Sequence, residues 1–232
     1  MQETKLGKFS VVFPNSKEFH SLKKEIWGED IYHFETEKES PVILDIGSHI
    51  GISVLYFKAI YPKSKIFAFE PNPISFKYLE ENIYRNNLSN IKAFNKAVWK
   101  ESTKRDLYVD GTQNEWNSNS SFLEKSWTGK EQTKKIIVDT TTLDEYLKYE
   151  VDMLKIDTEG CELTLIKANE HLLMNVNNIS IEYHPIQNSK PEDILNILKK
   201  YFSIEIYYEG KYIKRLERGK LLTIKGKKLV NN

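Results

Sequence analysis

The stretch that decides the fold reads VILDIGSHIG, from Val42 to Gly51. Its apolar start is typical of a buried strand, and the residues after Gly51 have the spacing of a helix. Glycine at position 47 lets the backbone approach a ligand closely, Gly51 lets the helix pack against the strand, and the helix N-terminus offers N–H groups. Asp45, near the strand end, can accept a hydrogen bond from an ammonium group.

The alternation of strand, turn and helix repeats along the rest of the chain, which predicts a doubly wound, mostly parallel α/β sheet of seven strands. The expected strands are Val42 to Asp45, Lys65 to Glu70, Ile91 to Val98, Asp152 to Asp157, Asn178 to Tyr183, Ile204 to Tyr208 and Leu221 to Lys225. The expected helices are Gly51 to Ile60, Pro73 to Asn86, Leu143 to Tyr149, Glu162 to Met174 and Pro191 to Tyr201. We expect the last two strands to be antiparallel.

Two segments stand outside this alternation. Residues 1–40 lack a clean strand period apart from a helix-like stretch from Ser16 to Trp27, and we interpret them as a cap on a single Rossmann-like domain of residues 41–232. The stretch from Thr103 to Val138 predicts a strand pair with a long loop, and long loops on rigid scaffolds often carry binding residues.

Composition narrows the class of protein. The 34 basic and 33 acidic residues nearly cancel, so the overall charge indicates neither a polyanion partner nor an anionic membrane surface. The single cysteine, Cys161, excludes an intrachain disulfide and agrees with a reducing compartment. No apolar run approaches the roughly 20 residues of a membrane span, and no secretory signal is visible. We therefore expect a cytoplasmic protein.

The second expected strand ends in Phe69-Glu70-Pro71-Asn72-Pro73. It places the Glu70 carboxylate about 20 residues beyond the glycine turn, where it can accept both hydroxyls of a ribose. His49 occupies the position of the middle glycine that a dinucleotide fingerprint needs, which favours a nucleoside ligand without a pyrophosphate. The alternative is an ordinary strand-to-helix turn and a solvated carboxylate.

The third expected strand contains Asn95 and Ala97, where an adenine would rest, although Asn95 is also a common turn former. The nucleoside pocket predicted from the sequence comprises Asp45, Gly47, Ser48, Gly51, Glu70, Asn72, Asn95 and Ala97.

Acidic residues follow the fourth and fifth expected strands. Asp157 and Glu159 come after one strand, and Glu182 with His184 ends the next. Because strand ends in open α/β sheets face the ligand crevice, these groups predict a general-base site or an oxygen-ligand metal site. The alternative for Asp157 and Glu159 is capping of the following helix.

These motifs together resemble the FkbM family of methyltransferases over about residues 41 to 185. The resemblance rests on DIGSHIG from Asp45, FEPNP from Phe69, NKAV from Asn95, LKIDTEGCE from Leu154 and IEYH from Ile181, with Asn119-Ser120-Ser121 as a further small-residue stretch. It implies S-adenosylmethionine as cofactor and O-methylation of a hydroxyl on a sugar or natural product. His49 departs from the family, which usually has alanine or asparagine near this position.

For such a reaction we expect His184 to be the base, with Asp157, Glu159 and Glu182 orienting the acceptor or binding a divalent ion. The expected partner is a small-molecule or glycan acceptor. An NAD-dependent oxidoreductase and a non-catalytic binding module are the less favoured readings. A nucleic-acid methyltransferase is a further alternative, based on the C-terminal basic residues Lys211, Lys214, Arg215, Arg218, Lys220, Lys225, Lys227 and Lys228, which also suit a solvated sheet edge.

Overall fold

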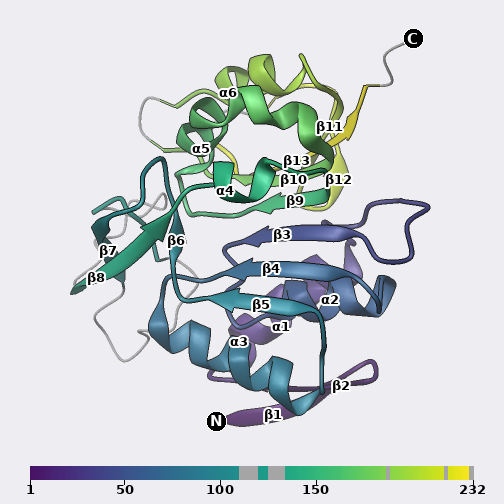
Figure 1. The fold of residues 1–232 in the computed structure, drawn as a ribbon, viewed down its shortest axis with the longest axis vertical. Coiled ribbons are helices and arrows are strands. Elements are labelled where there is room, and N and C mark those ends of the chain that lie inside the picture. The colour runs from purple at the N-terminus through teal and green to yellow at the C-terminus, as the bar shows by residue number, and fades with distance from the viewer. Residues whose placement is uncertain (110–119, 125–133, 187–188, 217–218, 230–232) are drawn as a thin grey trace.

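A central sheet organises the molecule (Figure 1). The computed structural model describes residues 1–109, 120–124, 134–186, 189–216 and 219–229. Within them the sheet has eight strands in the order β12-β11-β13-β10-β9-β3-β4-β5. Their bounds are β3 (Val42–Ile46), β4 (Lys65–Phe69), β5 (Ile91–Phe94), β9 (Val151–Ile156), β10 (Val176–Tyr183), β11 (Phe202–Tyr208), β12 (Lys211–Tyr212) and β13 (Leu222–Lys228).

Five neighbouring strands, from β5 to β10, are parallel, and β13 lies antiparallel between β10 and β11. The predicted doubly wound, mostly parallel sheet and its antiparallel ending are therefore confirmed. The two-residue strand β12 adds an edge that the sequence did not indicate.

The predicted strand from Ile91 to Val98 is wrong in its second half, because β5 ends at Phe94 and the chain turns there. The Asn95 side chain donates hydrogen bonds to the carbonyls of Glu70 and Pro71, at 2.8 and 3.1 Å, and redirects the backbone there. Residues Ala97–Val98 then form β6 in a second, three-stranded sheet with β7 (Lys104–Val109) and β8 (Lys134–Thr141).

This small sheet confirms the predicted strand pair between residues 103 and 138, with β7 antiparallel to β8. It stands beside the edge of the central sheet at which β3, β4 and β5 end (Figure 1). Most of the predicted long loop, including Asn119, lies outside the described residues.

Helices cover both faces of the central sheet, and each face has its own hydrophobic cluster. The helices α1 (Ser16–Leu22), α2 (Ile52–Ile60) and α3 (Pro73–Arg85) contribute to one cluster. The helices α4 (Asp144–Leu147), α5 (Glu162–Ala168) and α6 (Pro191–Leu198) contribute to the other. Because side chains alternate along a strand, Ile43 belongs to the first cluster and Leu44 to the second.

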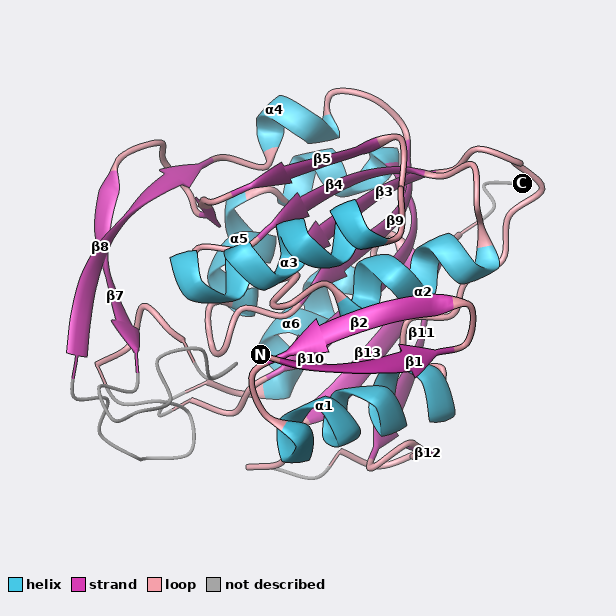
Figure 2. Cartoon of the chain, turned by 90° about the horizontal axis from the view of Figure 1, so that it is seen from below, coloured by secondary structure: helices cyan, strands magenta, loops and turns pink. Residues whose placement is uncertain are grey.

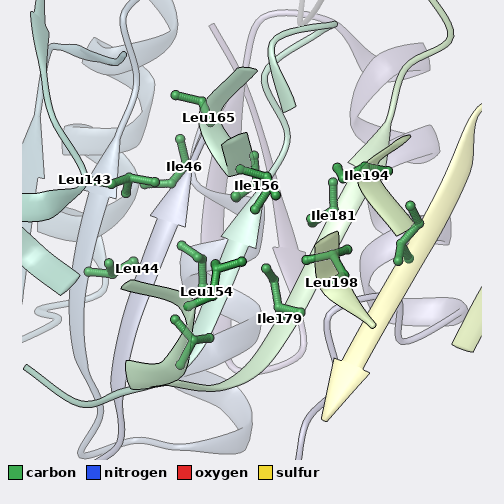
Figure 3. Packing of buried hydrophobic residues seen from close by; sticks show 14 of the residues in the cluster. Leu44, Ile46, Leu143, Leu154, Ile156, Leu165, Ile179, Ile181, Ile194 and Leu198 are labelled. Carbon is green, nitrogen blue, oxygen red and sulfur yellow. The ribbon is translucent and has the colours of Figure 1, made fainter. Parts of the chain in front are cut away.

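Figure 3 shows the second cluster from close by. Leu44, Leu154 and Ile179 come from three neighbouring strands, and Leu165 and Leu198 from the helices that cover them. All five side chains are at most 2% exposed. This packing fixes the strand ends at which the site is built.

Three helices are shorter in the structure than the sequence predicted. The stretch from Glu162 to Met174 is broken, because the Asn169 side chain donates to the Leu165 carbonyl at 2.9 Å and a 3₁₀ helix (Glu170–Asn175) follows α5. The helix predicted from Leu143 to Tyr149 is only the short α4. The helix-like stretch from Ser16 is α1 followed by a π-helical turn (Lys23–Gly28).

An N-terminal hairpin of β1 (Gln2–Leu6) and β2 (Phe9–Phe13) was not predicted from the sequence (Figure 2). Two asparagines one turn apart hold it, Asn82 in α3 and Asn86 directly after this helix. The Asn82 side chain bonds to both the N–H and the carbonyl of Val12, and the Asn86 side chain does the same for Ser10. Among the described residues, no helix has the length and apolar character needed to cross a membrane.

Candidate active site

Two adjoining cavities open where the parallel strands end. They share five lining residues, which are Leu22, Gly47, His49, Asp157 and Glu159. The first cavity extends toward β4 and the small sheet, and the second extends toward β10 and the helix α1. Ligand crevices at this edge are typical of open α/β sheets.

The glycine turn between β3 and α2 forms the floor between the cavities. Gly47 has φ +78°, and a Cβ atom there would lie 1.8 Å from the backbone carbonyl oxygen of Asp157. Position 47 therefore requires glycine because the backbone of Asp157, directly after β9, lies against it. A ligand that approaches the turn would add a second reason. A Cβ at Gly51, with φ +89°, would lie 2.7 Å from the Leu79 Cδ1. This glycine therefore lets α2 pack against α3, whereas the sequence led us to expect packing against the strand.

Asp45 lies below the turn and lines neither cavity. Its side chain is fully buried, Oδ2 accepts a 2.6 Å hydrogen bond from Ser53, and Oδ1 lies 3.3 Å from the Lys155 ammonium. Ser48 is buried as well, and its hydroxyl donates to the Asp45 carbonyl at 2.9 Å. These contacts brace the turn, and an ammonium group of a ligand would have to compete with Lys155 for Asp45.

Glu70 stands at the end of β4 and lines the first cavity. Its carboxylate accepts the backbone N–H groups of His49 and Asn72, each at 2.8 Å, and burial raises its pKa. A carboxylate has about four lone-pair sites, so two remain for a ligand. Asn72 itself caps α3 through Ile74 and donates to the Ser120 hydroxyl at 3.1 Å, and it does not line the cavity.

The remainder of the first cavity is an apolar slot. Phe69, Ala97 and Val98 form one part of its wall, and Leu107 and Phe122 of the small sheet and its following segment form another. Ser120 and Ser121 also line it. A slot of this composition suits a flat aromatic base.

The acidic groups at the ends of β9 and β10 meet in the second cavity, as expected from the parallel pairing of these strands. Asp157, Glu182 and His184 each bring one nitrogen or oxygen atom to within 4.8 Å of the others. The Glu159 carboxylate lies 3.6 Å from His184 Nε2, and its backbone has φ +53°.

His184 is enclosed by carboxylates on both ring nitrogens. Nδ1 lies 3.1 Å from Glu162, which also accepts hydrogen bonds from Thr158 and Gly160 and so closes the turn before α5. Burial lowers the pKa of His184, but Glu159 and Glu162 outweigh it and raise the pKa to about 10. At neutral pH the ring is an imidazolium, which disfavours its expected role as base.

Two carboxyl groups titrate near neutral pH instead. Burial, with Asp157 adding repulsion, raises the pKa of Glu182 to about 7, although His184, a hydrogen bond from Tyr32 and Lys155 lower it. Burial raises the pKa of Glu159 to about 8. Perturbed acids in a cleft are typical of functional sites.

Lys155 was not identified from the sequence, although it lies in the quoted Lys-Ile-Asp motif. Its side chain is 2% exposed and lines the second cavity. The ammonium donates to the Gly47 carbonyl and lies 3.5 Å from Asp157. Burial lowers its pKa, but the surrounding carboxylates, with Asp45 first, raise it well above the usual range. Its position inside the apolar run of β9 is the feature of the sequence that could have identified it.

The N-terminal segment of residues 1–40, for which we keep the name cap, also contributes to the second cavity, through Leu22, Glu25 and Tyr32 among others. No local motif marks these residues, because their spacing is that of ordinary core positions. A third cavity shares Glu25, Glu182 and Leu221 with the second and continues between the π-helical turn and the β11–β13 connection. Its other walls include Lys24, Glu29, Tyr208, Lys211 and Lys220.

The strand order, the glycine turn after β3 and the acid after β4 define a Rossmann-like methyltransferase fold. A crystal structure of the methyltransferase FkbM from Methylobacillus flagellatus shares this fold, with a TM-score of 0.57 and 15% identity over 83% of this chain. This chain spans 45% of that structure's chain.

The profile of the family described as "Methyltransferase FkbM domain" matches residues 45–203, more than half of the sequence. The chain therefore belongs to the FkbM methyltransferase family. It is 28% identical over 159 residues to the 2-O-methyltransferase NoeI of Sinorhizobium fredii, and the match covers 63% of this chain and 65% of NoeI. It is 27% identical over 171 residues to the hexuronic acid methyltransferase AglP of Haloferax volcanii, covering 72% of this chain and 64% of AglP.

Proposed function

We propose that this methyltransferase uses S-adenosylmethionine to methylate a hydroxyl group of a sugar or related small molecule. The observation that carries the proposal is the adjacency of two unlike cavities at the glycine turn. One is an apolar slot with a carboxylate at its entrance, and the other collects acids and an imidazolium.

The first cavity fits the adenosine part of the cofactor. The adenine occupies the apolar slot beside Phe69 and Ala97. The ribose hydroxyls donate to the lone pairs of Glu70 that do not accept a backbone N–H group. Gly47 and Ser48 line the path into the second cavity. Asp45, Gly51, Asn72 and Asn95 act indirectly, because their contacts hold the turn and the strand ends. When bound, the cofactor supplies an electrophilic methyl group on a sulfonium.

The acceptor lies in the second cavity and extends into the third. Both are lined largely by charged and hydroxyl-bearing side chains, which suits a hydroxylated ligand more than an apolar one. The names of the two relatives, a 2-O-methyltransferase and a hexuronic acid methyltransferase, agree with such an acceptor.

Glu182 is the residue that takes the hydroxyl proton of the acceptor. It lines both the second and third cavities, and its pKa of about 7 suits a base that works near neutral pH. The proton moves to carboxylate oxygen Oε2, because Tyr32 donates to Oε1. Asp157 and Glu159 orient the hydroxyl, and the His184 imidazolium lies 3.6 Å from the Glu159 carboxyl group.

A divalent ion at Asp157, Glu182 and His184 is the second interpretation, favoured by the closeness of three ligand-type atoms. An imidazolium has no lone pair for a metal. A metal would have to displace the proton that Glu159 and Glu162 favour on His184, so we propose proton transfer without a metal as the first interpretation.

A nucleic-acid acceptor is less favoured, because two lysines in the described part of the basic C-terminal stretch make contacts within the protein. Lys225 donates to the Asp30 carbonyl at 2.7 Å and lies over the Tyr207 ring, and Lys220 lies over the Tyr208 ring. Such lysines pack on the tyrosines of β11 and on the backbone at Asp30. Arg218 lies outside the described residues.

Two experiments test the proposed function. Calorimetry should show binding of S-adenosylmethionine and S-adenosylhomocysteine but not of NAD, and binding of NAD alone would contradict the proposal. Methyl-labelled cofactor incubated with the small-molecule fraction of a cell extract should yield a labelled product, which mass spectrometry identifies. Label found only in RNA would favour the nucleic-acid alternative.

A further inference from the structure

Tyr32 reaches the second cavity from the cap and contacts the proposed base. Its side chain is 1% exposed, and its hydroxyl donates a hydrogen bond to Glu182 Oε1. The ring packs against Phe57, with centroids 6.2 Å apart, and faces the Lys155 ammonium at 5.2 Å. Core packing thus fixes the ring, and the ring fixes the direction of the hydroxyl.

The backbone that carries Tyr32 is tied to the central sheet at two further points. The Ser180 hydroxyl on β10 donates to the Ile31 carbonyl at 3.1 Å, and Lys225 on β13 donates to the Asp30 carbonyl. In addition, Tyr56 of α2 donates to the Asp30 side chain at 3.0 Å. The Tyr32 hydroxyl therefore has a fixed position relative to the strand that bears Glu182.

The groups around Glu182 differ in what they can do for its carboxylate. Asp157 and Glu159 repel its charge, and Lys155 and His184 attract it. Among these five neighbours, Tyr32 is the neutral hydroxyl donor, and it donates to Oε1 of Glu182. Burial and Glu182 raise the pKa of Tyr32 well above its usual value, so the hydroxyl keeps its proton and stays a donor.

We propose that Tyr32 is a positioning residue that holds Oε1 of Glu182 so that Oε2 faces the acceptor hydroxyl. The inference rests on the proposed function of Glu182 as base. It makes the cap part of the reaction machinery, because the cap supplies the donor that orients a residue of β10.

The test compares two buried tyrosines, of which one bonds to the Glu182 carboxylate and the other does not. Tyr32→Phe removes the hydroxyl and keeps the ring. Tyr183→Phe is the matched control, since its hydroxyl pairs with Ser189 at 2.7 Å. With labelled S-adenosylmethionine and a small-molecule extract as probes, Tyr32→Phe should lower the transfer rate about 10- to 100-fold and leave cofactor affinity within about twofold. Tyr183→Phe should retain the parent rate.

A double-mutant cycle separates positioning from packing. If Tyr32 acts through Glu182, Tyr32→Phe combined with Glu182→Gln should be no slower than Glu182→Gln alone. Additive losses in the cycle, or the parent rate in Tyr32→Phe, would overturn the inference. Both outcomes leave the proposed function intact, because the parent still binds the cofactor and transfers the methyl group.

A second measurement needs neither cofactor nor acceptor. The ¹³C carboxyl signal of Glu182, identified by its loss in Glu182→Gln, should move in Tyr32→Phe and stay in place in Tyr183→Phe. An unmoved signal in Tyr32→Phe would show that the hydroxyl does not hold the carboxylate, even if the parent proved inactive with every acceptor.

Discussion

The first and second cavities lie side by side but are built in different ways. Around the first, backbone groups do most of the holding, since Glu70 binds two N–H groups and the Gly47 turn touches the backbone of Asp157. Around the second, side chains from the cap, β9, α5 and β10 hold one another. Substitutions in the turn should therefore disturb the fold, whereas substitution of Glu182 or Tyr32 in the second cavity should mainly disturb chemistry.

The largest effect is expected from Gly47→Val. The new Cβ would overlap the Asp157 carbonyl at 1.8 Å, and φ +78° strains a β-branched residue. The free energy of unfolding should fall by about 3 kcal/mol or more, measured by denaturant unfolding. Gly219→Val is the control for backbone strain alone, because Gly219 has φ +70° and open space around it. Equal losses in both variants would refute the contact as the cause.

Glu182→Gln should next lower the methyl-transfer rate by about 10²- to 10⁴-fold, the usual contribution of a general base. Cofactor affinity should change little, because Glu182 does not line the first cavity. Rate assays with labelled cofactor measure the first effect and calorimetry the second. Glu205→Gln, at an exposed position on β11, is the control. A larger loss in His184→Gln than in Glu182→Gln would restore His184 as the base.

Glu70→Gln should weaken binding of S-adenosylmethionine by about 10- to 100-fold, since two hydrogen bonds to a charged acceptor are weakened. Calorimetry with S-adenosylhomocysteine measures it, and Glu80→Gln on the exposed side of α3 is the control. Unchanged affinity in Glu70→Gln would place the ribose elsewhere.

These comparisons also show what the sequence could predict. The fold and Glu70 follow from local patterns, because a strand end, a glycine turn and a helix start are adjacent in the chain. The convergence of Asp157 with Glu182 and His184 follows from the topology of a parallel sheet. The directions of Lys155 and Tyr32 depend on packing between segments far apart in the sequence, which no local pattern encodes.

The pH dependence should sharpen the assignment of roles. Activity should rise as Glu182 loses its proton around its pKa of about 7 and fall as His184 loses its proton around about 10. The pKa of His184 is raised from 6.5, so its stabilising effect on the fold is complete below 6.5 and is lost as pH rises through about 10. Rates and unfolding midpoints measured across this range check both limbs. A rate that increases through pH 6.5 and is independent of Glu182 would contradict the scheme.

The smallest effect is expected from a chelator. If His184 stays an imidazolium, EDTA should leave the transfer rate unchanged, and added Mg²⁺ or Mn²⁺ should not raise it. The measurement is the labelled transfer assay before and after dialysis against EDTA. Loss of activity that Mg²⁺ restores would favour the metal interpretation of the acidic edge.

The division of the site into two cavities is tested most directly by a crystal structure with S-adenosylhomocysteine. We predict the adenine in the slot beside Phe69 and Ala97, the ribose hydroxyls on Glu70, and the sulfur next to the second cavity with Glu182 and Asp157. An adenine bound in the second or third cavity, or a ribose away from Glu70, would contradict the account.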